Sequence, residues 1–288
     1  MSLAVAVGAA LGSALGQALS STMQHRSAIA APRGSGLRFG LLWHLSRRPA
    51  WLAGAGLGGV GFALQAVALG SGTLVVVQPL LVTGLLFAVL AGALADRRLP
   101  RPAEWCWSAL LVLGLAVFLL AANPAAGTKR ADDHLLLSLL VLLGGAAVLA
   151  VAGAQRGRPA WAAIWLGVAA GIAHGATAAL MKGAVADAAG GPVGVLRHWP
   201  LWALIGVSLA ATVLTQAAYQ AGPLVDSLPV MTMIDTVVAI GLGTLAFSES
   251  VAVSMTASGL QVASLTLMAV ALVGLTRRPG RDPAAVSS

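Results

Sequence analysis

The chain has 288 residues, of which 58% are hydrophobic and only 9% are charged, and its formal net charge is +8. Soluble domains carry about 25% charged residues, so this composition excludes an ordinary soluble domain and indicates a protein of the lipid bilayer. The positive charge does not indicate nucleic-acid binding, because membrane proteins collect Lys and Arg in their cytoplasmic loops. A single cysteine, Cys106, excludes an internal disulfide and a cysteine-ligated metal cluster.

Apolar segments of about 20 residues can each cross the hydrocarbon core, and in lipid such segments form helices. The first segment has no basic region before it and exceeds signal-peptide length, so we expect it to be a retained helix. We predict about nine spans and therefore an all-α, polytopic transmembrane helical bundle. In chain order the predicted spans are 3–23, 51–69, 72–95, 105–122, 134–153, 160–181, 201–220, 224–246 and 254–275.

The 17 Lys and Arg residues divide unequally between the two sets of loops. The loops on one side hold only Lys129, Arg130, Lys182 and Arg197, and the other side holds the remaining thirteen. The positive-inside rule therefore predicts a multi-pass protein of the cell membrane with its N-terminus outside and its C-terminus in the cytoplasm.

Two parts of the chain resemble each other. Ala68–Leu81 aligns without a gap with Ala218–Met231, which places Pro79 over Pro229. Weak internal duplication in a polytopic membrane protein is typical of transporters whose binding site lies between the repeats. Two glycine series also align in order and predict close helix packing: Gly8, Gly12 and Gly16, and Gly167, Gly171 and Gly175. We predict a first membrane repeat over 1–122, a linking helix within 123–159, an inverted second repeat over 160–275 and a cytoplasmic tail over 276–288.

Polar side chains inside a bilayer are costly, so the places where they gather are informative. One helical stripe on the span 201–220 contains Ser208, Thr212, Thr215, Gln216 and Tyr219. A similar stripe on the first span contains Ser13, Gln17, Ser20 and Gln24. The functional interpretation is that both stripes face a water-filled cavity; the alternative is that these groups only hydrogen-bond neighbouring helices.

Asp235 lies deep in the span 224–246, about 16 Å from its start at 1.5 Å per residue. A carboxylate at that depth should face protein or water, so we expect it to be the main substrate- or ion-binding group, with Thr232 on the same side. His174 is similarly deep in the span 160–181 and could carry a proton near neutrality. A neutral His174 that donates to a carbonyl is the structural alternative, and the sequence leaves open whether Asp235 and His174 touch.

Prolines at matched positions predict broken or kinked helices in both halves, which is typical of a binding region. Pro79 follows Gln78, and Pro229 follows Asp226 by three residues. The alternative for Asp226 is an ordinary helix start, where both Asp and Pro are favourable. With Gln65, these residues complete the predicted binding set.

The stretch Gln65–Leu81, the F-S-E-S motif of Phe247–Ser250 and the two inverted repeats resemble the drug/metabolite transporter superfamily, in particular its EamA-like and small multidrug-resistance exporters. In that family an acidic residue closes the helix that the proline-containing stretch opens. Asp96 and Glu249 match that place here, and we expect both at the membrane interface. The resemblance implies alternating-access transport of a small solute or metabolite, with proton-coupled export as one form. The small exporters keep a membrane-embedded Glu in the first helix, where this chain has Gln17, so their mechanism does not transfer directly.

The predicted outside N-terminus is closer to the NIPA-type magnesium transporters of the same superfamily. A divalent-cation transporter is therefore the alternative function, and a non-transporting scaffold or lipid-binding protein is the second alternative. We expect no enzyme and no cofactor, because hydrolase, kinase and zinc motifs are missing from the sequence. The expected partners are the lipid bilayer, a small solute or cation and, as one option, a second copy of the chain. The sequence does not decide whether the site takes a metal ion.

Overall fold

The computed structural model describes residues 3–29, 45–84, 86–87, 90, 99, 101–128, 130–157, 159–188, 191, 196–222 and 224–276. Within these ranges the chain is built from helices joined by short loops, which confirms the expected all-α fold. In chain order the helices are α1 (Leu3–Ile29), α3 (Pro49–Ser71), α4 (Leu74–Leu81), α6 (Pro102–Ala122), α7 (Asp133–Arg156), α8 (Pro159–Ala188), α10 (Trp199–Ala221), α11 (Leu224–Ala246) and α12 (Met255–Thr276).

Eight of the described helices are long and apolar enough to cross a membrane, so the chain is a multi-pass membrane protein. The helix outside this group is α4, which has 8 residues and covers the start of the predicted span 72–95. A turn at Val82 and Thr83 follows Pro79 closely, as the sequence predicts. Most of 85–98, including Asp96, lies outside the described residues.

Of the predicted break or kink at Pro229, the break is wrong. Pro229 lies within α11, and the helix continues through it to Ala246. A proline removes one backbone hydrogen-bond donor, but membrane helices tolerate this loss where neighbouring helices hold the segment in place. The two prolines therefore have different local structures despite their matched positions.

Several helix ends follow from local sequence signals. Pro49 and Pro102 each stand in the first turn of α3 and α6, where a missing N–H costs nothing. The Glu104 side chain accepts a hydrogen bond of 2.7 Å from the Arg101 backbone N–H. The Asp132 side chain caps α7 by accepting a hydrogen bond of 2.8 Å from the Leu135 backbone N–H.

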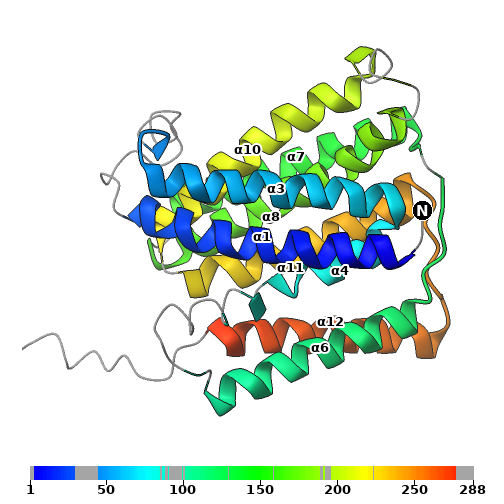
Figure 1. Cartoon of the computed structure of the whole chain (residues 1–288). Helices are drawn as coiled ribbons and strands as arrows, with labels where there is room; N and C mark the ends of the chain where they lie inside the picture. The colour runs from blue at the N-terminus through cyan, green and yellow to red at the C-terminus, as the bar shows by residue number, and fades with distance from the viewer. Residues whose placement is uncertain are drawn as a thin grey trace, which may run out of the picture.

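The helices pack in a small number of close pairs. α1 lies along α3, and α8 contacts α10, α11 and α7 (Figure 1). α6 and α12 form a further pair at one side of the bundle, seen at the bottom of Figure 1. The short helix α4 contacts both α1 and α11.

Glycines allow α8 to approach α11 at backbone distance. A Cβ atom at Gly171 would lie 2.6 Å from the Met231 carbonyl oxygen, and a Cβ at Gly175 would lie 2.8 Å from the Asp235 carbonyl oxygen. Real Cβ atoms essentially never come this close to other heavy atoms. The predicted close packing of this glycine series is therefore confirmed, and it fixes the segment of α11 that carries Asp235 against α8.

The first glycine series behaves less uniformly. A Cβ at Gly16 would lie 3.2 Å from Gly61 Cα, which shows that α1 and α3 also pack closely. In contrast, a Cβ at Gly8 would have no neighbouring atom within 4 Å. The predicted close packing is therefore wrong at Gly8, which lies near the start of α1 where no described helix covers it.

We expect Gly175→Ala to lower the melting temperature, because the new methyl group would also lie 2.7 Å from Val238 Cβ. Overpacking of this kind costs about 1–3 kcal/mol. Gly183→Ala is a matched control on the same helix, because its nearest neighbour, Pro200 Cβ, is at an ordinary 3.8 Å. Thermal unfolding of the purified protein in detergent measures both variants. Equal melting temperatures would contradict the close packing of α8 on α11.

Candidate functional site

A cavity of about 480 Å³ lies between helices of the two predicted halves. Its walls come from α1, α3 and the end of α4 on one side and from α8, α10 and α11 on the other. Eight of the residues predicted for the binding set line it: Gln17, Gln65, His174, Thr212, Gln216, Tyr219, Thr232 and Asp235. Residues separated by up to 218 positions in the sequence therefore meet at one place, from Gln17 to Asp235.

The polar stripe of α10 turns toward this cavity over its whole length. Ser208, Thr212, Thr215, Gln216 and Tyr219 all belong to the cavity wall. Leu209, on another face of the same helix, is 53% exposed on the outside of the bundle. This arrangement follows from the helical repeat, because residues three and four positions apart share one face.

Amide side chains connect the first and second halves of the chain across the cavity. Gln216 Nε2 donates to Gln24 Oε1 at 2.5 Å, and Gln24 Nε2 donates to Ser20 Oγ at 2.7 Å. Gln216 is fully buried, and its own Oε1 has no hydrogen-bond partner among the described residues. The chain of amides thus leaves a free acceptor in the cavity wall.

Asp235 presents a second free acceptor. Its Oδ1 atom is buried from bulk solvent and has no hydrogen-bond partner in the described part of the chain. The glycine contacts of α8 hold its backbone in place, so the carboxylate is a positioned group on a closely packed helix. Most buried polar atoms in proteins have a partner, and an unpaired one in a cavity therefore points to a ligand, an ion or water.

His174 does not pair with Asp235 in this structure. His174 Nε2 lies 2.9 Å from Thr215 Oγ1, so the imidazole hydrogen-bonds across from α8 to α10. Thr215 Oγ1 also lies 3.6 Å from Met231 Sδ on α11. Both His174 and Asp235 line the cavity, but each has its own surroundings there.

Two residues of the predicted binding set stand apart from the other eight. Gln78 is fully buried in α4 and is not among the residues that line this cavity. Neither atom of its amide group has a hydrogen-bond partner among the described residues. Asp226 belongs to α11, but its side chain lies outside the described part of the structure.

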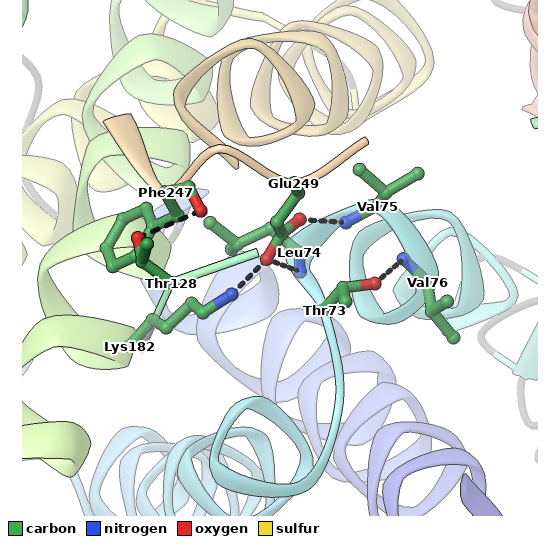
Figure 2. A network of polar contacts seen from close by, with 8 residues as sticks. All are labelled: Thr73, Leu74, Val75, Val76, Thr128, Lys182, Phe247 and Glu249. Carbon is green, nitrogen blue, oxygen red and sulfur yellow. Dashed lines mark hydrogen bonds and ion pairs between the residues drawn. The ribbon is translucent and has the colours of Figure 1, made fainter. Parts of the chain in front are cut away.

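A buried ion pair was not predicted from the sequence. Lys182 Nζ donates to Glu249 Oε1, and their side chains are 9% and 0% exposed (Figure 2). Glu249 follows the end of α11 by three residues and is buried within the protein. The assignment of Lys182 to a loop is wrong, because α8 extends to Ala188. The missed signal was the absence of any helix-breaking residue between Lys182 and Gly190 apart from Gly183.

Comparison with known proteins places the chain in a family. It is 32% identical over 265 residues to the "Uncharacterized protein Cgl0250/cg0304" of Corynebacterium glutamicum, and the match covers 89% of each chain. The chain belongs to the same family as this Corynebacterium protein. No family model matches the chain, and no solved structure matches it.

Proposed function

We propose that the protein is a transporter of the drug/metabolite type that moves a small solute across the cell membrane by alternating access. The observation that carries this proposal is the cavity shared by α1, α3 and α4 with α8, α10 and α11. The close pairs α1–α3 and α8–α10 occupy equivalent places in the two predicted repeats. A binding site between repeats is the arrangement expected of secondary transporters.

The size and lining of the cavity support a small organic solute. A volume of about 480 Å³ falls within the range of about 300–1,000 Å³ for small-molecule sites. Apolar side chains such as Phe62 and Met231 line the cavity together with the amides and the Asp235 carboxylate. The free acceptors at Asp235 Oδ1 and Gln216 Oε1 would accept hydrogen bonds from the donor groups of such a solute.

The same lining gives less support to a divalent cation. Hard cations take about six or more oxygen ligands, usually including several carboxylates. Asp235 is the one carboxylate among the described residues of the cavity wall. Within the described ranges, no three His, Cys, Asp or Glu side chains come together as metal ligands would.

We propose a transport role for the cavity and no catalytic one. The hydrogen bond between His174 and Thr215 joins a base to a hydroxyl group, as in a nucleophile–base pair. Catalytic sites of that kind also orient the base by a third group, usually a carboxylate. In the described part of the chain no carboxylate forms an ion pair with His174, so His174 is better interpreted as a cavity-wall residue that links α8 to α10.

Single cysteines on α10 test whether the cavity holds water, as transport requires. In a Cys106→Ser background, cysteines at Thr212 and Gln216 should react with a charged, water-soluble thiol reagent, because both positions line the cavity. Cysteines at Leu209, which faces outward, and at Ala217, which packs with Leu166 and does not line the cavity, should stay unreactive. Protein in native membranes is labelled and the modified fraction measured by mass shift. Equal reactivity at all four positions, or at none, would favour the alternative in which the polar stripe only joins helices.

A further inference from the structure

The cavity occupies only one half of the bundle. On α1 its wall begins at Ala14 and continues to Gln24, and on α3 it extends from Trp51 to Gln65. On α10 it begins at Ser208, nine residues after the helix starts at Trp199. These wall segments meet at one end of the bundle, where Gln24 hydrogen-bonds to α10. We call this the cavity end.

The opposite half of the same helices is filled with apolar side chains. One core cluster joins Ala10, Leu69, Leu74, Met181 and Phe247, all of them buried. The packing is tight, because a Cβ at Gly72 would lie 2.9 Å from Ala6 Cβ. We call this half the sealed end.

The buried ion pair lies at the sealed end and joins three segments of the chain. Lys182 belongs to α8, and Glu249 follows α11. The Glu249 carboxylate also accepts hydrogen bonds from the first N–H groups of α4, at 2.9 Å from Leu74 N and 3.1 Å from Val75 N (Figure 2). Its negative charge complements the free N–H groups and the positive end of that helix.

Neighbouring contacts hold the segment of Glu249 in place. Lys182 Nζ lies 4.9 Å from the centre of the Phe247 ring. The Phe247 carbonyl oxygen accepts two hydrogen bonds from Thr128, one of 2.7 Å from the backbone N–H and one of 3.0 Å from the side-chain hydroxyl. Figure 2 shows the bond from the hydroxyl. Ala125 and Ser250 form a short antiparallel bridge beside it. The loops after α6 and α11 therefore close over this end together.

An ion pair is a suitable closure for an end that has to open. A buried pair is often no more stabilising than apolar residues of the same size, because both charges lose their hydration. When water enters, the separated charges regain hydration, which offsets the cost of breaking their contact. An apolar plug would gain nothing on exposure, so the charged closure keeps the closed and open states closer in free energy.

The helices of the ion pair are also walls of the cavity. Thr177 lines the cavity five residues before Lys182, a rise of about 7.5 Å along α8. Leu81, the last residue of α4, and Val82 after it line the cavity. At the other end of α4, the Leu74 N–H donates a hydrogen bond to Glu249 Oε1. A shift of either helix on solute binding would therefore reach the ion pair.

We propose that Lys182 and Glu249 are the gate residues of the sealed end, and that their ion pair breaks when the cavity opens to that side of the membrane. This inference rests on the proposed transport function. The structure represents the state that is closed at the sealed end. The orientation derived from the positive-inside rule makes this the outer side of the membrane.

The test compares reagent access from the two sides of the membrane. A reporter cysteine replaces Thr177 in a Cys106→Ser background, and oriented vesicles receive a charged, impermeant thiol reagent on one side at a time. The paired change Lys182→Met with Glu249→Gln removes both charges together and so avoids an unpaired buried charge. We expect it to accelerate labelling from the sealed end at least about tenfold, because rare open states are typically populated at about 0.1–10% and have room to increase.

A matched control breaks another ion pair of the same end. Asp187 is bonded to Arg130 at 2.9 Å and to His198 at 3.2 Å, and Asp187→Asn should leave sealed-end labelling unchanged. Unchanged labelling in the paired variant, or fast sealed-end labelling with the pair intact, would overturn the gate. If either of these outcomes occurs while Thr212→Cys still reacts from the cavity end in the same preparations, only the proposed gate is wrong. If it does not react, the proposed transport function fails as well.

Discussion

Asp235→Asn is expected to reduce solute flux through the reconstituted protein by about ten- to a hundredfold. Asparagine keeps the shape of the side chain but removes its negative charge. A hydrogen bond to a charged group contributes about 1.5–3 kcal/mol, and each 1.4 kcal/mol is about tenfold in affinity. Because Asp235 is the one carboxylate among the described residues of the cavity wall, no described neighbour can replace it. Flux into proteoliposomes, with and without a proton gradient, measures the loss.

The folded protein should tolerate this substitution. Asp235 Oδ1 has no hydrogen-bond partner among the described residues, so the variant breaks no contact there and its melting temperature should stay close to that of the wild type. Asp133→Asn serves as a control, because that carboxylate is exposed and bonded to Trp199 Nε1 outside the cavity. Normal flux in Asp235→Asn would mean that Asp235 is structural, and the site assignment would be wrong.

Lys182→Met is expected to lower the melting temperature more than Gly175→Ala or Asp235→Asn. It leaves the Glu249 carboxylate buried without its cation, and breaking a buried pair in this way costs about 3–5 kcal/mol. For a chain of this size the loss corresponds to a fall in melting temperature on the order of 10 °C. Thermal unfolding of the purified protein in detergent measures it.

Adding Glu249→Gln to this variant should recover most of the lost stability. Glutamine is neutral, and its Oε1 can still accept from the Leu74 N–H. The two single variants and the double variant form a cycle that isolates the interaction between the side chains. If the double variant melts no higher than Lys182→Met, the ion pair does not hold the closed end.

The sequence predicted the contents of the cavity better than its boundaries. Helical periodicity identifies a face, and the stripe from Ser208 to Tyr219 on α10 does line the cavity as one face. Depth in a span identified Asp235, because a carboxylate in hydrocarbon must turn toward protein or water. Neither argument gives the rotation of a short helix, so neither could show whether Gln78 of α4 lines the same cavity as the stripe of α10.

Contacts between distant segments could not be predicted in this way. His174 bonds to Thr215, 41 residues away, although its depth suggested Asp235 as a partner. Lys182 and Glu249 are 67 residues apart, and the predicted span 160–181 left the lysine just outside, in a loop. The positive-inside rule counts basic residues near span ends and cannot recognise one whose partner is a buried carboxylate on another segment.

Matched sequence positions also failed to give matched structures. Pro79 precedes a turn, whereas α11 runs through Pro229 without interruption. Around Pro229, α11 packs closely from Ser227 to Val238 against the glycine face of α8. A proline interrupts a membrane helix only where no neighbour compensates for the lost hydrogen bond.

The most direct measurement of the central claim is solute flux in proteoliposomes that contain the wild-type protein. Three probe classes are compared side by side with protein-free vesicles: amino acids, the amphiphilic cation tetraphenylphosphonium, and Mg²⁺. A small-solute transporter should carry an organic probe faster than protein-free vesicles do, and Asp235→Asn should abolish the difference. Flux of Mg²⁺ alone, or flux no faster than in protein-free vesicles for all three classes, would contradict the account.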